Sequence, residues 1–469
     1  MTAHVDALAR ELARASGRAV TTAESTLLAD DATVPFGIAT VKIVAEDVVQ
    51  AIAFGRLDQP PTVLARWNPM SRESGDLTPF AEALDAEIDD ALASGRCPRI
   101  WLPHRASADV LDLLGHRYRR NPNASPALQR MGVQLRAISQ ESTVAGQQVL
   151  AVASELLQQH AVTGQAPVRD GHLGALLEWF DSPAVGDGEE VAERAERAAL
   201  VPASGVLEAR DDERSERLRR EAKRRGGTGP AREELERLLA AAARREWAQL
   251  VRARQAWLRL RLPPSPHVGA LADESLTRLR WRLDTDAATA RRPPALIRHL
   301  DRHERALEIV EDARLRSDPA YRRQAATTGH AWTAEVVGID QPRRGFRPCV
   351  LELRVPQAVL RLRGGHKVTP LSTRAAGIVT DVAEHPDGGW TVLVELTSGV
   401  RTPPPLGHLE DWLPAPPPDL GALRARSNRR AEQADHPLLT ARPLPPGRPR
   451  PPLAEDLLAA ARAMRRAAP

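Results

Sequence analysis

Cysteine is almost absent from this sequence of 469 residues, which holds only Cys97 and Cys349. The two lie far apart and neither belongs to a Cys-x-x-Cys pair, so the sequence excludes a disulfide framework and a cysteine zinc site. Long apolar runs are also missing, since none approaches the roughly 20 residues that a membrane-spanning helix needs. We therefore expect no membrane association, a cytoplasmic location, and a short amphipathic helix over residues 1–18 in place of a signal peptide.

Several motifs that carry chemistry are missing as well. The sequence contains no G-x-x-x-x-G-K-[ST], no G-x-G-x-x-G and no G-x-S-x-G, which argues against a self-contained nucleotide motor and against the usual esterase elbow. His299 and His303 are four residues apart on a predicted helix, a spacing that occurs in helical metal sites. No third ligand accompanies them, and His303 also aligns with the apolar face of that helix. We therefore expect no cofactor, no metal site and no catalytic residue.

Lysine is scarce, with only Lys42, Lys223 and Lys367, so nearly every positive charge is an arginine. Alanine and proline are abundant too, which is typical of a bacterial protein from a GC-rich genome, and the net charge of +4 is then weak evidence for a polyanionic partner. The distribution of charge is more informative. Residues 1–200 carry 18 Lys and Arg against 27 Asp and Glu, whereas residues 201–469 carry 47 against 34. The basic half lies downstream.

The order of β-type and helical patterns predicts an α+β, multi-domain chain. The predicted parts are an acidic α/β domain at 1–183, a linker at 184–207, a basic helical region at 208–325, a small antiparallel β-barrel-like module at 330–412, and a Pro-rich tail with a short terminal helix at 413–469.

Within the α/β domain, the β-rich runs Val48–Gly55 and Thr62–Trp67 predict a hairpin. Helical apolar spacing predicts helices at Pro79–Ala93, Ser125–Ser139 and Val144–His160. In the basic region, a helix is expected from Pro230 to about Leu262, as part of a bundle or an elongated hairpin.

The barrel-like module and the tail differ sharply in composition. The module is predicted from five β-type runs: Trp332–Ile339, Cys349–Val355, Val359–Arg363, Gly377–Val382 and Trp390–Leu396. Residues 414–452 contain 11 prolines, too many for continuous helix or sheet, and Leu453–Ala467 is expected to form the terminal helix.

A row of arginines on the predicted long helix is the main candidate binding site. Arg245, Arg252 and Arg259 recur every seven residues and so share one side of the helix, with Arg254 and Trp257 nearby. Guanidinium groups can follow a phosphate backbone and an indole can stack on a base, so we predict that these five residues bind nucleic acid. The alternative is a solvated helix face with the tryptophan in the core.

The segment His104-Arg105-Ala106-Ser107-Ala108-Asp109 resembles the H-N-A-x-F-D motif of DEDD-type 3′–5′ exonucleases. The preceding order of two strands, a helix and a third strand resembles part of that fold. The resemblance implies a nuclease whose acidic residues hold two metal ions. This chain lacks the Asp-x-Glu of the family's first strand, offering only Glu46-Asp47 or Asp30-Asp31 out of pattern, and it lacks the final His-x-x-x-x-Asp. A shared fold would therefore carry a broken metal site.

The β module, with Leu362-Arg363-Gly364-Gly365-His366-Lys367 at its centre, is similar to small barrels found in helicases and other nucleic-acid proteins. Together these features favour a non-catalytic accessory or scaffold protein that bridges partners, among them nucleic acid and a protein such as a helicase or ATPase. The alternative is a metal-dependent 3′–5′ exonuclease-like nuclease, or its inactive relative, using the N-terminal domain.

Overall fold

The structure is a computed structural model that describes residues 3–29, 33–43, 48–69, 77–165, 171–182, 187–200, 205–285, 293–340, 349–372, 375–399, 403–417 and 420–433. The chain divides into two compact units, Met1–Thr289 with Arg302–Pro417 and Ala290–Asp301 with Pro418–Pro469. The first unit holds a five-stranded sheet, its covering helices and a closed barrel, which confirms the predicted α+β class. Among the described helices, none is long and apolar enough to cross a membrane.

The five-stranded sheet has the order β4-β3-β2-β5-β6. Its strands are β2 (Phe36–Ile43), β3 (Val48–Arg56), β4 (Thr62–Ala65), β5 (Ile100–Leu102) and β6 (Leu150–Val152). The first three strands form an antiparallel meander, and β5 and β6 run parallel to β2. β2 and β3 are buried on both faces, which explains their nearly continuous apolar sequences. The predicted hairpin of β3 and β4 is confirmed.

Three helices cover one face of this sheet: α2 (Thr78–Ala93), α3 (Arg105–Tyr118) and α4 (Pro126–Ser142). Proline occupies the first turns of α2 and α4, and the Ser125 hydroxyl caps α4 by accepting a hydrogen bond from the amide of Leu128. Phe54 of the sheet packs edge-on against Phe80 of α2, with ring centroids 5.2 Å apart. The apolar spacing that predicted these helices therefore marks their core-facing sides.

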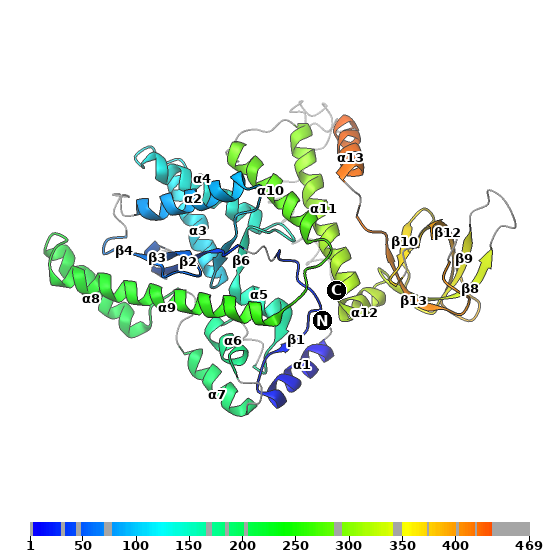
Figure 1. Cartoon of the computed structure of the whole chain (residues 1–469), viewed down its shortest axis with the longest axis horizontal. Helices are drawn as coiled ribbons and strands as arrows, with labels where there is room; N and C mark the ends of the chain where they lie inside the picture. Colours follow the sequence, from blue (N-terminus) through cyan, green and yellow to red (C-terminus); the bar gives the residue numbers. More distant parts are fainter. Residues whose placement is uncertain are drawn as a thin grey trace, which may run out of the picture. The chain divides into compact units, whose positions relative to one another are not determined.

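The opposite face is covered by the long helix α9 (Pro230–Leu260), together with α5 (Ala153–His160) and α6 (Leu173–Phe180) (Figure 1). The strands present mainly small side chains on this face, so α9 can approach closely. At Gly37 of β2, an added Cβ would lie 2.8 Å from the Trp247 ring of α9. The basic helix that we expected in a separate bundle or hairpin instead shares a core with the sheet.

The remaining helices and the short strand pair complete the first unit's helical part. They are α1 (Ala3–Ser16), β1 (Val20–Thr21) paired with β7 (Ala161–Val162), α7 (Gly188–Ala198), α8 (Ala209–Arg224), α10 (Val268–Thr285), the part of α11 (Pro293–Ser317) from Arg302 onward, and α12 (Pro319–Thr327). Trp179 is fully buried among side chains of α1 and α7, so the amphipathic N-terminal helix is confirmed and belongs to a small core of its own.

Six antiparallel strands close the barrel in the order β10-β11-β12-β9-β8-β13. They are β8 (Trp332–Asp340), β9 (Val350–Val355), β10 (Lys367–Pro370), β11 (Ala376–Glu384), β12 (Trp390–Ser398) and β13 (Leu409–Pro414). Inward and outward side chains alternate along β9, and Trp332, Leu351, Val394 and Trp412 fill the interior. The barrel-like module is thus confirmed as a closed barrel.

Two expectations for individual elements were wrong in the α/β domain and the barrel. Val144–His160 is not one helix, because β6 occupies Leu150–Val152 and only Ala153–His160 is helical. Val359–Arg363 is not a strand but part of the connection between β9 and β10.

The linker and tail also contain unexpected helices. Residues 184–207, predicted as a linker, contain α7, and the Pro-rich segment contains α13 (Leu420–Gln433), which begins after the first cluster of prolines. The expected terminal helix Leu453–Ala467 lies outside the described residues. The domain boundaries themselves stay predictions.

Candidate functional site

The arginine row of α9 lies against carboxylates of the same chain. Arg252 donates to Asp181 at 2.9 Å and to Glu178 at 3.3 Å, both at the C-terminal end of α6. Arg259 also pairs with Asp181. Arg245 Nη2 lies 3.6 Å from Asp211 Oδ2 of α8. Each arginine of the row therefore faces an acid that is distant in the sequence.

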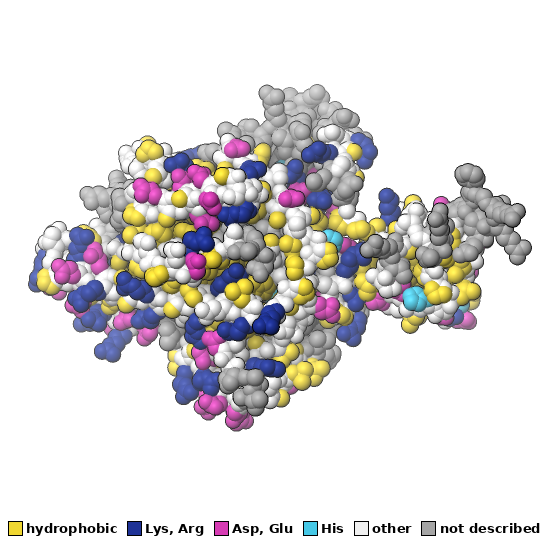
Figure 2. Space-filling model, in the orientation of Figure 1, with side chains coloured by type: hydrophobic (Ala, Val, Ile, Leu, Met, Phe, Trp, Pro, Cys, Tyr) yellow, Lys and Arg dark blue, Asp and Glu magenta, His cyan; other side chains and the backbone are white. Residues whose placement is uncertain are grey.

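Electrostatics reinforce these pairings. Burial lowers the pKa of Arg252, but the hydrogen bonds and charges of Asp181 and Glu178 outweigh that effect, so the pKa is raised above its ordinary value. Figure 2 shows Lys and Arg side chains interspersed with Asp and Glu over the face that α8 and α9 present. The three arginines of the row are about half exposed, but each has a carboxylate partner within the chain. Binding of nucleic acid by these residues stays a prediction.

Arg254 and Trp257 have structural partners too. The Arg254 guanidinium lies over the ring of Trp101 in β5, 5.2 Å from its centroid. Trp257 is only 5% exposed and packs edge-on against His160, with ring centroids 4.7 Å apart. Because its ring is covered, Trp257 is not placed to stack on a base.

A buried polar network lies beyond the C-terminal end of β5, beside the parallel strand β2. Thr40 Oγ1 is 3.4 Å from Ser107 Oγ, which is 3.4 Å from His104 Nδ1, and His104 Nε2 is 3.3 Å from Glu246 Oε2. Thr40 comes from β2, His104 and Ser107 from the start of α3, and Glu246 from α9. The four side chains thus connect the sheet to the helices on both of its faces.

Serine, histidine and glutamate in contact are the residue types of a nucleophilic triad. Ser107 is fully buried, however, and His104 and Glu246 are 5% and 6% exposed. A substrate has no access to the hydroxyl in this arrangement. The network instead satisfies the hydrogen-bonding groups of polar side chains that the packing of α9 removes from water.

The exonuclease resemblance implies that several acids converge near Asp109. β2 carries Thr40 and Lys42 as its only polar side chains and has no acid. Asp109 is exposed on α3, and Gly205 packs against the Thr40 carbonyl, where an added Cβ would lie 2.2 Å from the oxygen. Among the described residues, the acid of the network is Glu246, and it is paired with His104.

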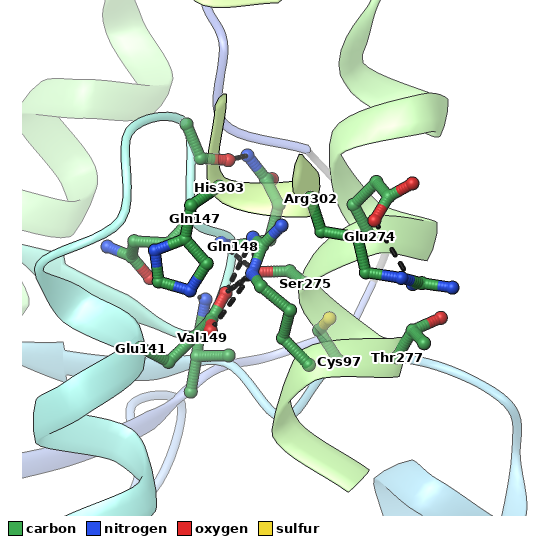
Figure 3. Close-up of polar contacts among 12 residues, drawn as sticks. Cys97, Glu141, Gln147, Gln148, Val149, Glu274, Ser275, Thr277, Arg302 and His303 are labelled. Atoms are coloured by element: carbon green, nitrogen blue, oxygen red, sulfur yellow. Dashed lines mark hydrogen bonds and ion pairs between the residues drawn. The ribbon is translucent and has the colours of Figure 1, made fainter. Parts of the chain in front are cut away.

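A second buried cluster, between α4 and α10, was missed by the sequence analysis. The Glu141 carboxylate is fully buried and accepts hydrogen bonds from Arg278 at 2.7 Å and from Ser275 at 2.7 Å (Figure 3). Arg282 Nε lies 3.5 Å from its other oxygen. A glutamate in line with the apolar positions of α4 was the available signal, because a carboxylate on that face needs a buried partner.

His303 lies beside this cluster, and its surroundings disfavour a cation. Burial, followed by the charges of Arg278 and Arg282, lowers the pKa of His303 to about 4. A metal ion there would meet the same two guanidinium groups. Over the part of the chain that the structure describes, no group of three or more His, Cys, Asp or Glu side chains is arranged to hold a metal ion.

A cavity of about 650 Å³ is lined by residues 22–28, by α5 and by α11. Two of its charged side chains, Arg105 and Glu155, pair with each other at 3.0 Å. A third, Arg314, lies over the ring of Tyr321 at 6.0 Å from the centroid. These three charged side chains of the cavity are therefore engaged within the chain.

Comparison with known proteins adds no assignment, because family models, curated proteins and solved structures each gave no match to this chain.

Proposed function

We propose that this chain is a non-catalytic accessory protein that binds nucleic acid and bridges it to another protein, such as a helicase or ATPase. In this proposal the N-terminal domain is an inactive relative of the exonucleases that it resembles, and it serves as a scaffold. The observation that carries the proposal is the filled network of Thr40, Ser107, His104 and Glu246, over which α9 packs. A cytoplasmic location belongs to the same proposal, supported by two free, buried cysteines.

The physical argument concerns what two-metal cleavage requires. Two divalent ions need several carboxylate oxygens around the scissile phosphate, because water and phosphate alone do not hold them in place. The network beside β2 and α3 holds a threonine, a serine, a histidine and one carboxylate that is already bound to that histidine. An accessory role requires no cleavage, and this set of residues supports that part of the proposal.

The test measures binding and cleavage on the same preparation. End-labelled single- and double-stranded DNA and RNA are incubated with the full chain and with magnesium or manganese, and binding is measured by anisotropy at about 50 mM salt. We expect binding without cleavage, and identical background cleavage by wild type and Asp109→Ala.

Metal-dependent cleavage that Asp109→Ala abolishes would establish the nuclease alternative instead. Absence of binding to all four substrates at low salt would remove the nucleic-acid part of the proposal.

A further inference from the structure

The connection between β9 and β10 carries three exposed basic side chains and an exposed histidine. Arg361, Arg363, His366 and Lys367 fall within seven residues, and all four side chains are exposed. None of them forms an ion pair or a side-chain hydrogen bond with any described residue. We name residues 356–367 the cationic barrel loop.

Its charge contrasts with the arginines found elsewhere. Arg252 and Arg259 of α9 pair with Asp181, and on the barrel itself Arg354 lies 3.9 Å from Asp387. The described carboxylates of the barrel lie on its strands and on other turns. An approaching polyanion therefore meets uncompensated positive charge at the cationic barrel loop, and no internal pair has to be broken.

The backbone of this loop is held in place although its four exposed charged and histidine side chains have no partner among the described residues. The amide of Gly365 donates to the carbonyl of Val379 at 2.7 Å, and the amide of Val379 donates to the carbonyl of His366 at 2.8 Å. Gly365 has φ +89°, a conformation that favours glycine, so the pair Gly364-Gly365 turns the chain tightly into β10.

The other end of the loop is fixed by the last turn of α12 and by Gly329, which follows that helix. The amide of Arg361 donates to the carbonyl of Gly329 at 3.1 Å, and Gln357 Nε2 donates to the carbonyl of Ala326 at 3.4 Å. A ligand that binds here has to order only side chains, since the backbone is already fixed. This preorganisation lowers the entropic cost of binding.

We propose that the cationic barrel loop binds the sugar-phosphate backbone of a nucleic acid. Guanidinium forks match pairs of phosphate oxygens, and the ammonium group of Lys367 adds a point charge at the start of β10. The loop offers charge and hydrogen-bond donors, which recognise phosphate independently of base sequence. The inference rests on the proposed function and replaces the α9 row with a different surface.

The experiment compares two triple variants of the full chain that lose the same charge. Arg361→Gln/Arg363→Gln/Lys367→Gln removes the loop cations, and Arg245→Gln/Arg252→Gln/Arg259→Gln removes the α9 row. Affinity for a labelled single-stranded oligonucleotide and for its duplex is measured by anisotropy at a series of salt concentrations. Thermal melting of each variant checks that the fold is retained.

We expect the loop variant to lower the salt slope of log K by about 2 on single strands, and to weaken binding roughly 100-fold at about 0.1 M salt. The row variant should keep the wild-type slope. If the loop variant binds nucleic acid with the same salt slope of log K as wild type, this inference is overturned and the proposed function still stands. A slope lowered only by the row variant likewise overturns it in favour of α9, and absence of wild-type binding overturns both proposals.

Discussion

A buried ion pair and an exposed ion pair can have similar contact distances, but losing the buried pair lowers the free energy of unfolding much more. Glu141 and Arg278 are both fully buried, so Glu141→Gln leaves two guanidinium groups, those of Arg278 and Arg282, without their carboxylate. We expect this change to lower the free energy of unfolding by about 3–5 kcal/mol. Urea denaturation followed by circular dichroism measures it.

The matched control is Glu221→Gln, which removes an exposed partner of Arg225 at 2.9 Å on α8. Water already solvates both groups of that pair, so the expected loss is below about 0.5 kcal/mol. Equal losses for the two variants would contradict the assignment of Glu141 as a charge that only its buried partners stabilise.

His303 should make the stability depend on pH. Its pKa is lowered to about 4 by burial and by the charges of Arg278 and Arg282, so between about pH 6.5 and 4 the unfolded chain binds a proton that the folded chain does not. Stability is therefore full above pH 6.5 and falls as the pH drops through this window. Because the ring is partly solvated, the contribution is on the order of 1 kcal/mol.

His303→Gln should flatten the dependence of the urea midpoint on pH between 7 and 4.5. The control is His330→Gln, since His330 is exposed and faces the Thr328 hydroxyl rather than a guanidinium group. We expect the urea midpoint to depend less on pH in His303→Gln than in His330→Gln. Equal dependence in the two variants would show that His303 does not cause the pH effect.

The carboxylate partners of the arginine row could not be predicted from the spacing of the arginines. Heptad spacing places Arg245, Arg252 and Arg259 on one side of a helix, but it does not say which segment packs against that side. Asp181 precedes Arg252 by 71 residues and lies at the end of another helix. Periodicity is a local property, whereas ion pairing here depends on how α6 and α9 pack.

At the scale of elements, one glycine sets how closely two helices approach. Gly132 of α4 faces the end of α3, where an added Cβ would lie 2.3 Å from the backbone nitrogen of Arg119. Backbone cannot move aside as a side chain can, so Gly132→Ala should destabilise the chain by about 1–3 kcal/mol. Urea denaturation again gives the value.

Gly269→Ala is the control within a different helix, α10, because nothing lies within 4 Å of the position its Cβ would take. Alanine favours the helical backbone by up to about 1 kcal/mol, so this change should be neutral or stabilising. Both substitutions replace glycine by alanine. If both lower the free energy of unfolding, the loss in Gly132→Ala does not come from the contact of α3 with α4.

Helices and strands could be predicted where the segment was long enough for its apolar side chains to show a helical or alternating spacing. β3, β9, β11 and β12 show long β-type runs, and the 31-residue helix α9 shows an apolar stripe beginning after Gly229-Pro230. β6 has only three residues, and its leucine, alanine and valine continue the spacing of the helix that follows it. Such a strand is defined by its neighbour β5, so the local sequence could not separate it from α5.

At the scale of the molecule, the sequence separated an acidic domain from a basic helical region, and the physical core crosses that division. Ala39, Val41, Ala51 and Ala53 of the sheet are almost completely buried in the same cluster as Leu235, Leu239, Trp247 and Leu250 of α9. Charge composition reports on the solvated surfaces of two segments. It carries no information about the apolar faces that the segments share.

A fragment of residues 1–200 should therefore fail to fold as an independent domain, whereas residues 1–285 should fold. Without α9, one face of the sheet is exposed to water. Burial of each large apolar side chain on α9 contributes about 1.5–3 kcal/mol, so the five largest together approach the whole stability of a typical domain. Urea titration should show a cooperative transition for 1–285 and none for 1–200. A cooperative transition of 1–200 with the same midpoint would mean that the α/β domain is complete without its basic helix, and that α9 only lies upon it.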